Sequence, residues 1–389
     1  MTVWDDLVGQ GPLIATLKDS VAAADEALRG NRAAGMTHAW LFTGPPGSGR
    51  SNAAKAFAAA LLCDDGGCGE CLACRTALAG SHADVTHVVT DQSQHRVDDI
   101  REIVRLAALA PAGRRWQVVV IEDADRLNDR SADALLKSIE EPPPRTVWLL
   151  CAPTAEDVVP TIRSRCRSLV LRTPSTQAVA EHLIARDGVP ESVAVFAARA
   201  SQGHIGRARA LALDDDTRNR RREVLRVPTQ LSDLGSCVTT AAGLIEAATA
   251  EAAPRAETLD ARELADLEAA YGVGSRGVRA TGFAPAQKEL QRAQKQRVKR
   301  FMRDAIDRYL LDIASFYRDV LAVQMGASTA LVNEELRPEI SSIARNTDGE
   351  TIAARLAAIF ATRESLEGEV APTLALESLM ISLRGVPQA

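Results

Sequence analysis

Aromatic side chains are scarce in this sequence: they make up 4% of its 389 residues, although hydrophobic residues as a whole make up 46%. Aliphatic residues therefore supply most of the apolar surface, and alanine is prominent in the stretches of helical composition. This balance favours a helix-rich protein and disfavours a β-sandwich. The length is enough for two or three domains, each with its own hydrophobic core.

An excess of positive charge is also missing, because 46 Lys and Arg residues face 51 Asp and Glu residues and leave a net charge of -5. The molecule as a whole is therefore excluded as an electrostatic nucleic-acid binder, and any DNA contact has to come from local patches. No apolar run approaches the ~20 residues that a membrane-spanning helix needs. Residues 1–6 lack the basic segment and following apolar stretch of a secretory signal, so we expect a cytoplasmic location.

The segment Gly44–Ser51 reads Gly-Pro-Pro-Gly-Ser-Gly-Arg-Ser and matches the phosphate-loop template G-x-x-x-x-G-K-[ST] except at one position. Arg50 stands where the template has lysine, and its planar, forked guanidinium does not simply replace a compact ammonium. An apolar run at 37–43 precedes the loop and a helical stretch at 51–62 follows it, which is the context the motif requires. An ordinary Gly/Pro turn is the alternative, and whether ATP and Mg²⁺ still bind stays open. The predicted nucleotide contacts in the loop are Gly44, Gly47, Gly49, Arg50 and Ser51.

A second motif begins at Val118, where four apolar residues end in the acids Glu122 and Asp123. This pattern is typical of a Walker-B strand, in which the first acid helps to hold magnesium and the second orients the attacking water. The usual order is Asp then Glu, so the reversal changes the reach of each acid by one methylene group. Catalytic geometry is sensitive to displacements of ~1 Å. The alternative is a strand that ends in two solvated acids.

Strand-like and helical stretches alternate through the first part of the chain. Further strands are predicted at 85–90, 117–122, 146–152 and 168–171, with helices at 97–109 and 129–141 between them. Such alternation predicts an α/β domain whose parallel sheet is covered by helices on both faces. The remainder has helical period, clearest at 264–271, 287–323, 351–366 and 372–383, with a loop at 272–285. We predict an α/β domain at 1–173 with a cysteine-rich insertion at 63–74, an all-α lid at 174–226 and an all-α domain at 227–389.

Four of the seven cysteines fall within twelve residues, and glycines lie among them. In a reducing compartment such a cluster indicates metal binding rather than disulfides. Four thiolates suit tetrahedral Zn²⁺, and a site with no open position for water is structural. Free thiols or a labile redox cluster are the alternatives, and Cys151 and Cys237 are isolated and expected to be inert. The predicted zinc ligands are Cys63, Cys68, Cys71 and Cys74.

Three basic segments are candidate DNA contacts. The run at 218–222 adjoins the acids at 214–216, so local pairing neutralises much of its charge, while Arg101 and Arg105 lie on the helix predicted at 97–109. The third segment lies on the long helix predicted at 287–323, where a solvated helix face is the favoured interpretation and phosphate tracking the alternative. Its basic residues are Lys288, Arg292, Lys295, Arg297, Lys299, Arg300 and Arg303.

Four short segments carry a family resemblance: 8–10, 38–44, 135–143 and Ser164–Cys166. They resemble the AAA+ clamp-loader family of bacterial DNA polymerase III, and in particular its delta-prime branch. The resemblance covers roughly residues 1–215 strongly and the C-terminal region weakly, chiefly at 372–383. It implies an AAA+ module, a lid and an oligomerising collar, acting as one component of a DNA-directed DNA polymerase (nucleotidyltransferase) holoenzyme. The implied partners are gamma/tau and delta subunits in a hetero-pentamer, the sliding clamp, and primer-template DNA bound through the complex.

In this family the arginine of the Ser-Arg-Cys triplet enters a neighbouring subunit's ATP site, which implies the role of an arginine finger in trans for Arg165. Other positions depart from the hydrolysing members: Gly206 takes the place of the lid arginine, and Ala152 and Pro153 take the places of the sensor threonines. Together with Arg50 and the reversed acids, they imply a stator with little or no ATP hydrolysis of its own. The alternatives are an ATP-hydrolysing gamma/tau-like subunit and a zinc-containing DNA-binding adaptor outside a ring.

Overall fold

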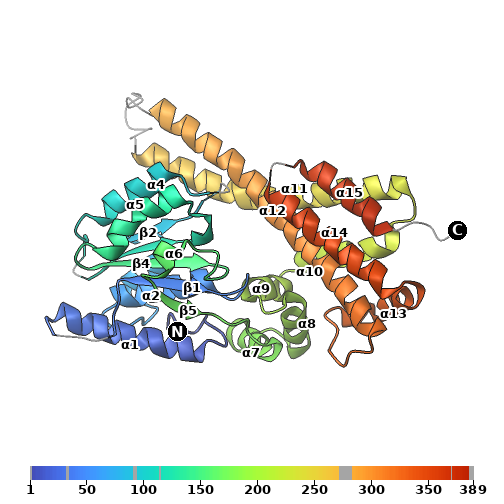
Figure 1. Cartoon of the computed structure of the whole chain (residues 1–389), viewed down its shortest axis with the longest axis horizontal. Coiled ribbons are helices and arrows are strands. Elements are labelled where there is room, and N and C mark those ends of the chain that lie inside the picture. The colour runs from blue at the N-terminus through green and yellow to red at the C-terminus, as the bar shows by residue number, and fades with distance from the viewer. Residues whose placement is uncertain are drawn as a thin grey trace. The chain divides into compact units, whose positions relative to one another are not determined.

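The computed structural model describes residues 2–31, 35–90, 94–113, 115–270, 283–368 and 370–384 (Figure 1). Its internal contacts divide the chain into two compact units, Met1–Leu213 and Asp214–Ala389. This division falls inside the range predicted for the lid, and the three-part division remains a prediction. Each unit has its own hydrophobic core and is described by itself.

A parallel five-stranded sheet forms the centre of the first unit, with the strand order β2-β3-β4-β1-β5. It confirms the predicted α/β class, and each strand lies within or close to a predicted stretch. Every residue of β1, β3 and β4 is buried, because helices cover both faces of the sheet. The strands are β1 (Ala39–Thr43), β2 (Val85–Val88), β3 (Gln117–Ile121), β4 (Thr146–Ala152) and β5 (Arg167–Val170).

Alternate residues of the strands supply the two layers of this core, as the two-residue period of a strand requires. On β1, Trp40 and Phe42 face one layer, where Trp40 makes an edge-to-face contact with Phe57 at a centroid distance of 5.2 Å. Leu41 faces the other layer. The helices around the sheet are α1 (Gly11–Leu28), α2 (Arg50–Leu62), α3 (Leu72–Leu78), α4 (Val97–Ala107), α5 (Asp129–Glu140) and α6 (Pro160–Arg163), with a 3₁₀ turn at Ala124–Arg126.

Three short helices complete the first unit: α7 (Thr176–Asp187), α8 (Glu191–Ser201) and α9 (Ile205–Leu213). The breaks between them lie at 188–190 and 202–204. Gly188 ends α7 with φ 65°, and Gln202 ends α8 with φ 52°, both in the left-handed conformation that commonly ends a helix. The three helices share a small core built largely from alanine, valine and leucine.

The second unit is entirely helical within the described residues, as the helical period of this region predicted. Residues 264–270 of the stretch expected at 264–271 are only the end of a 37-residue helix, and residue 271 lies outside the described residues. Residues 272–282 of the predicted loop lie outside the described residues, and the next helix already begins at Phe283, so the prediction was wrong for 283–285. The helices are α10 (Asp215–Gln230), α11 (Leu234–Ala270), α12 (Phe283–Gln324), α13 (Arg337–Asn346), α14 (Gly349–Glu367) and α15 (Pro372–Arg384), with a 3₁₀ turn at Glu334–Leu336.

Arg221, from the basic run at 218–222, is buried in this second unit, with 4% of its side chain exposed. Its guanidinium donates to Asp312, Asn333 and Glu335. A buried cation needs such partners because desolvation penalises the charge strongly. Arg221 therefore has a structural role within this unit. None of the helices within the described ranges is long and apolar enough to cross a membrane.

Candidate functional site

The phosphate loop joins the end of β1 to the start of α2, and its glycines have conformations that other residues avoid. Gly44, Gly47 and Gly49 have φ values of 155°, 84° and 92°. A Cβ atom on Gly44 would lie 2.7 Å from the carbonyl oxygen of Leu171, and one on Gly47 would lie 2.8 Å from His204 Cβ. The loop backbone is thus shaped as the sequence motif predicted, at the N-terminus of a 13-residue helix whose dipole favours an anion.

Arg50, which replaces the expected lysine, turns back across this loop. Its Nη1 donates a hydrogen bond to the carbonyl oxygen of Gly44, six residues earlier in the chain. A lysine at this position normally extends its ammonium toward the phosphates. The guanidinium instead closes the loop on itself, so part of its hydrogen-bonding capacity is already used.

The first acid of the reversed pair, Glu122, lies directly after β3 and has basic side chains from two other elements as neighbours. His87 Nε2 of β2 is 2.8 Å from Glu122 Oε1, and Lys55 Nζ of α2 is 3.8 Å from the same oxygen. Burial opposes ionisation of Glu122, yet His87, Lys55 and a hydrogen bond from Ser51 outweigh it and hold its pKa below the usual range. The carboxylate is therefore charged and already balanced by the protein's own groups.

The turn that carries both acids is held by His95, a buried residue of the loop before α4. Its Nε2 lies 3.0 Å from the carbonyl oxygen of Glu122 and 3.2 Å from that of Asp123. Two carbonyl acceptors require a donor, so Nε2 carries the proton. Asp123 itself is left-handed, with φ 52°, and its Oδ2 lies 3.9 Å from Arg126 Nε. Burial, followed by the charge of Asp123, raises the pKa of Asp125 beside it.

His204, in the turn between α8 and α9, packs directly against the phosphate loop. The closest approach is at Gly47, where an added Cβ would lie 2.8 to 2.9 Å from three carbon atoms of His204. The Nδ1 atom of His204 accepts a hydrogen bond from the backbone N–H of Arg207 at 3.2 Å, which fixes the imidazole at the start of α9. Gly206, which replaces the lid arginine, lies in the first turn of α9. Its added Cβ would be 3.4 Å from His204 Cε1.

The positions of the sensor threonines offer no free hydroxyl group near the loop. Ala152 is buried at the end of β4, and the Pro153 carbonyl accepts a hydrogen bond from the N–H of Gly44 at 3.0 Å. The adjacent Thr154 donates its hydroxyl to Asp157 at 2.7 Å and accepts from the Asp157 backbone at 3.3 Å. That hydroxyl group therefore serves an exposed local turn.

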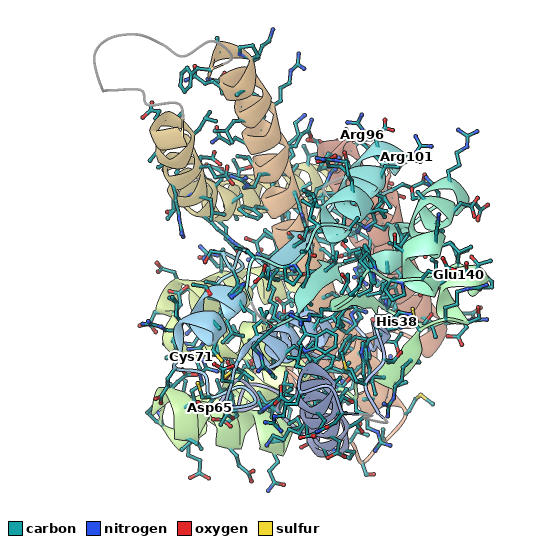
Figure 2. The ribbon with its side chains drawn as sticks, turned by 90° about the vertical axis from the view of Figure 1, so that its left-hand side faces the viewer. His38, Asp65, Cys71, Arg96, Arg101 and Glu140 are labelled. Atoms are coloured by element: carbon teal, nitrogen blue, oxygen red, sulfur yellow. The ribbon has the colours of Figure 1, made fainter. Side chains whose placement is uncertain are left out.

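Arg165 lies just beyond α6, and 38% of its side chain is exposed. Its Nε donates to Glu140 at 2.6 Å, at the end of α5, where Figure 2 labels Glu140. Its Nη1 donates to the carbonyl oxygen of Thr161 at 2.9 Å and to the hydroxyl group of Ser164 at 3.2 Å. The segments 135–143 and Ser164–Cys166, both noted in the sequence, are thus joined by one surface ion pair.

The four clustered cysteines converge between the end of α2 and the start of α3. Their Sγ atoms all lie within 4.8 Å of one another, and Cys63 Sγ is 3.6 Å from Cys68 Sγ and 3.7 Å from Cys71 Sγ. In a tetrahedral Zn(Cys)₄ site with bonds of about 2.3 Å, neighbouring sulfurs are about 3.8 Å apart. The donor set and spacing therefore fit a structural zinc ion (Cys71 is labelled in Figure 2).

Backbone N–H groups point at these sulfurs, as expected where thiolates are stabilised. Asp65 and Cys68 donate to Cys63 Sγ at 3.3 and 3.4 Å, and Cys71 donates to Cys68 Sγ at 3.4 Å. The N–H groups of Cys71 and Glu70 lower the pKa of Cys68 to about 7. Burial raises the pKa of Cys151 to about 12, in line with the expectation that this isolated thiol is inert.

The cysteine loop also anchors the N-terminal segment. Trp4 Nε1 donates to the carbonyl oxygen of Gly66 at 3.2 Å, and Val3 N–H donates to that of Gly67 at 3.0 Å. Gly67 has φ 101°, and a Cβ there would lie 2.6 Å from Val3 Cγ2. A folded cysteine loop thus connects the chain start to α2, the helix that begins at the phosphate loop.

Sequence reasoning identified the loop, the acids, Arg165 and the cysteines, and the structure brings the loop and the acids together at the ends of β1 and β3. Sequence reasoning did not identify four other residues at this site: His87, Lys55, His95 and His204. These residues form no recognisable sequence motif, because only the fold brings them close to the phosphate loop and the two acids. Arg101 and Arg105, the predicted DNA-facing pair on α4, are exposed and each contacts an acid one turn away: Arg101 Nη1 is 3.3 Å from Asp98 Oδ1, and Arg105 Nε is 2.9 Å from Glu102 Oε2.

Two segments of the chain match described protein families. Residues 23–175 match the family DNA polymerase III, delta subunit, and residues 294–385 match DNA polymerase III, delta subunit, C terminal. Among named relatives, the chain is 39% identical over 153 residues to the delta' subunit of Pseudomonas aeruginosa, covering 38% of this chain and 46% of that one. It is 30% identical over 246 residues to the tau subunit of Bacillus subtilis, covering 60% of this chain and 41% of that one.

The chain therefore spans less than half the length of these relatives. Among solved structures, a gamma subunit-related protein from Thermotoga maritima matches with a TM-score of 0.41 and 14% identity, over 94% of this chain and 98% of that one. The clamp loader delta protein of Bacillus subtilis matches with a TM-score of 0.32 and 12% identity, over 94% and 99%.

Proposed function

The chain belongs to the AAA+ clamp-loader family of DNA polymerase III, and we propose that within this family it acts as a delta-prime-like stator that hydrolyses little or no ATP of its own. In this role it completes a ring with gamma/tau and delta subunits. The ring opens a sliding clamp and places it on primed DNA. The chain lends Arg165 to the ATP site of the adjacent subunit.

The observation that carries the proposal is the state of Glu122. A magnesium-holding carboxylate has to be available to the ion and its waters. Here His87 lies 2.8 Å and Lys55 3.8 Å from the same carboxylate oxygen. Binding Mg²⁺ would bring a divalent cation beside this lysine, so repulsion opposes metal entry.

Two further features support the loss of hydrolysis. Arg50 is bonded to the carbonyl oxygen of Gly44, which leaves the phosphates without the compact lysine charge. Gly206 and Ala152 supply no polar side chain where hydrolysing members have arginine and threonine. The departures at Arg50, at the Glu122–Asp123 pair, at Ala152 and at Gly206 would all weaken the same reaction, which is ATP hydrolysis.

The assignment of Arg165 rests on its exposure and on the ease of releasing it. Its main partner is Glu140, and both side chains are more than one-third exposed. Exposed ion pairs contribute only about 0–1 kcal/mol, so little opposes reorientation toward a phosphate in a neighbouring subunit. In a trans site, a guanidinium stabilises the charge that develops on the transferred phosphoryl group.

We assign a structural Zn²⁺ ion to Cys63, Cys68, Cys71 and Cys74. All four donors are sulfur atoms, and together they fill the tetrahedral coordination, so no position remains for a reacting water. The ion would hold the cysteine loop against Val3 and Trp4. The residues that form the phosphate loop lie at the opposite end of α2, so the ion supports the fold and takes no part in ATP chemistry.

Reconstitution tests this function. We expect the purified chain to co-assemble with gamma/tau and delta subunits and to be required for loading a clamp onto primed DNA. The identity to tau subunits keeps a gamma/tau-like hydrolysing role as the second candidate. Clamp loading that persists in full without this chain would contradict the stator role, and a chain that remains monomeric with every partner would favour a zinc-containing adaptor outside a ring.

A further inference from the structure

The first half of α12 lies against the second half of α11, and its contacts define an inward face. Arg297 donates to Asp260 at 2.5 Å and to Glu263 at 2.6 Å. Gln294 Nε2 donates to the carbonyl oxygen of Asp260 at 3.2 Å. One turn further on, the guanidinium of Arg255 lies 4.3 Å from the ring centroid of Phe301. Positions 294, 297 and 301 of α12 therefore face α11.

Five other cations of α12 lie on the opposite face. Their sequence steps are four, three, four and four, and at about 100° per residue they fall within a sector of roughly 80° whose centre is about 170° from the inward positions. All five side chains are exposed. We call this set the α12 stripe; its members are Lys288, Arg292, Lys295, Lys299 and Arg303.

The stripe is not neutralised within the part of the second unit that the structure describes, where no carboxylate forms an ion pair with any of its five members. Between 283 and 303 the sequence contains one acid, Glu289, against seven Lys and Arg residues. The neighbouring cations Arg297 and Arg308 have acidic partners on α11. Like charges three or four residues apart on a helix destabilise it, and ordinary solvated faces intersperse the two signs.

We propose that the α12 stripe binds the phosphate backbone of duplex DNA without reading its sequence. From position 288 to 303 the helix rises about 22 Å, at about 1.5 Å per residue. A duplex has a phosphate every ~3.4 Å along each strand, so the stripe spans six to seven base pairs. Five Lys and Arg side chains aligned along a straight helix match a straight polyanion, and contacts of this kind position a protein on DNA without specifying bases.

The composition of this face discriminates among anionic partners. Single-strand sites add aromatic side chains on which bases stack. In the described part of 283–303 the two aromatic residues serve the interior: Phe283 is buried and Phe301 lies beneath Arg255. Membrane-surface helices need an apolar face next to the basic one. From Met302 onward the apolar face of α12 packs against other helices of its own unit, and in the stripe's half of the helix positions 294, 297 and 301 contact α11. Duplex DNA is thus the occupant that the surface fits best.

The test measures binding of the full-length chain to a labelled 20-base-pair duplex of arbitrary sequence by fluorescence anisotropy, from 50 to 200 mM salt. The variant R292Q/K295Q/K299Q removes the centre of the stripe. A matched control, K18Q/R226Q/R345Q, removes three exposed cations from α1, α10 and α13, and so changes the net charge equally.

We expect the stripe variant to bind at least about tenfold more weakly at 50 mM salt, and its log–log salt slope to be smaller by about 2.7, close to 0.9 for each lost phosphate contact. The control should match the wild type. If the triple variant does not fold, Lys295→Gln alone should reduce the slope by about 0.9. Equal affinity and slope in the stripe and control variants would overturn the inference, as would tighter binding to a 20-nucleotide single strand or to anionic vesicles. The stripe lies on α12, so an active or inactive ATP site leaves this result unchanged.

Discussion

The proposed function links two arginines of this chain to ATP sites, Arg50 to its own phosphate loop and Arg165 to a neighbouring subunit, and they differ in how firmly the fold holds them. Arg50 lies in the phosphate loop and bonds to the loop's own carbonyl oxygen, and the acid Glu122 has Lys55 and His87 as neighbours. Arg165 lies at the surface in an ion pair with Glu140, with 38% of its side chain exposed. A charge satisfied inside a half-buried cluster is therefore held by the fold, whereas an exposed ion pair of about 0–1 kcal/mol leaves its arginine available to a partner.

The largest expected effect follows from removing the available arginine. In a reconstituted ring, Arg165→Ala should leave assembly intact and slow hydrolysis at the adjacent subunit's site by about a thousandfold or more, because the transition-state charge loses its guanidinium. Single-turnover hydrolysis at that site measures the effect. Glu140→Gln is the matched control, since it releases Arg165 without removing it, and it should retain normal turnover. An unchanged rate with Arg165→Ala would remove the finger role.

Loss of the predicted zinc ion should come next in size. We expect Cys71→Ser to bind clearly less than one equivalent of zinc. We also expect its melting temperature to be about 5 °C or more lower, because the cysteine loop that holds Val3 and Trp4 loses its metal ion. Elemental analysis and calorimetry give the two values. Cys237→Ala, outside the cluster, should keep the zinc. Full zinc content in Cys71→Ser would contradict the assigned ligands.

Repairing the loop alone should have a smaller effect. Arg50→Lys restores the phosphate-loop template, and we expect ATP affinity to rise by no more than about tenfold, which is about 1.4 kcal/mol. Hydrolysis should stay absent, because Glu122 remains paired with His87 and Lys55. Titration with labelled nucleotide and a turnover assay separate binding from chemistry. Substantial ATP turnover in Arg50→Lys would show that the interactions of Glu122 with His87 and Lys55 do not prevent hydrolysis.

The smallest effect concerns Glu122 and pH. Its pKa is lowered in the folded chain, so its stabilising contribution is present above its unfolded pKa near 4.5 and is lost as pH falls through the folded value. Glu122→Gln should therefore reduce the free energy of unfolding by about 1–2 kcal/mol at pH 7 and by much less near pH 3. Denaturant unfolding at the two pH values measures this. A difference that grows toward acid pH would have the wrong sign.

Much of the first unit could be predicted because local signals there agree with the fold. The strands at 117–121 and 146–152 are buried along their whole length, and they are followed by Glu122 and Pro153 respectively. The second unit was harder, since α11 is rich in alanine, contains Pro254 and carries little periodic contrast. Its length depends on packing against α12, which no single segment of sequence contains.

The same distinction applies to the site. The loop glycines and the cysteine spacing are local patterns, and both were recognised. The pairing of Glu122 with His87 and Lys55 arises only when β2 and β3 lie side by side and α2 lies near the end of β3. Likewise, spacing alone could not separate Arg297, which faces α11, from the cations of the α12 stripe.

The measurement that tests the central comparison most directly is magnesium-dependent ATP turnover by the purified chain, with the Glu122→Gln variant beside it. We expect no turnover above buffer in either protein, because Arg50 and Glu122 both interact with groups of this chain. Turnover in the wild type that Glu122→Gln abolishes would establish a working ATP site in this chain and contradict the stator role.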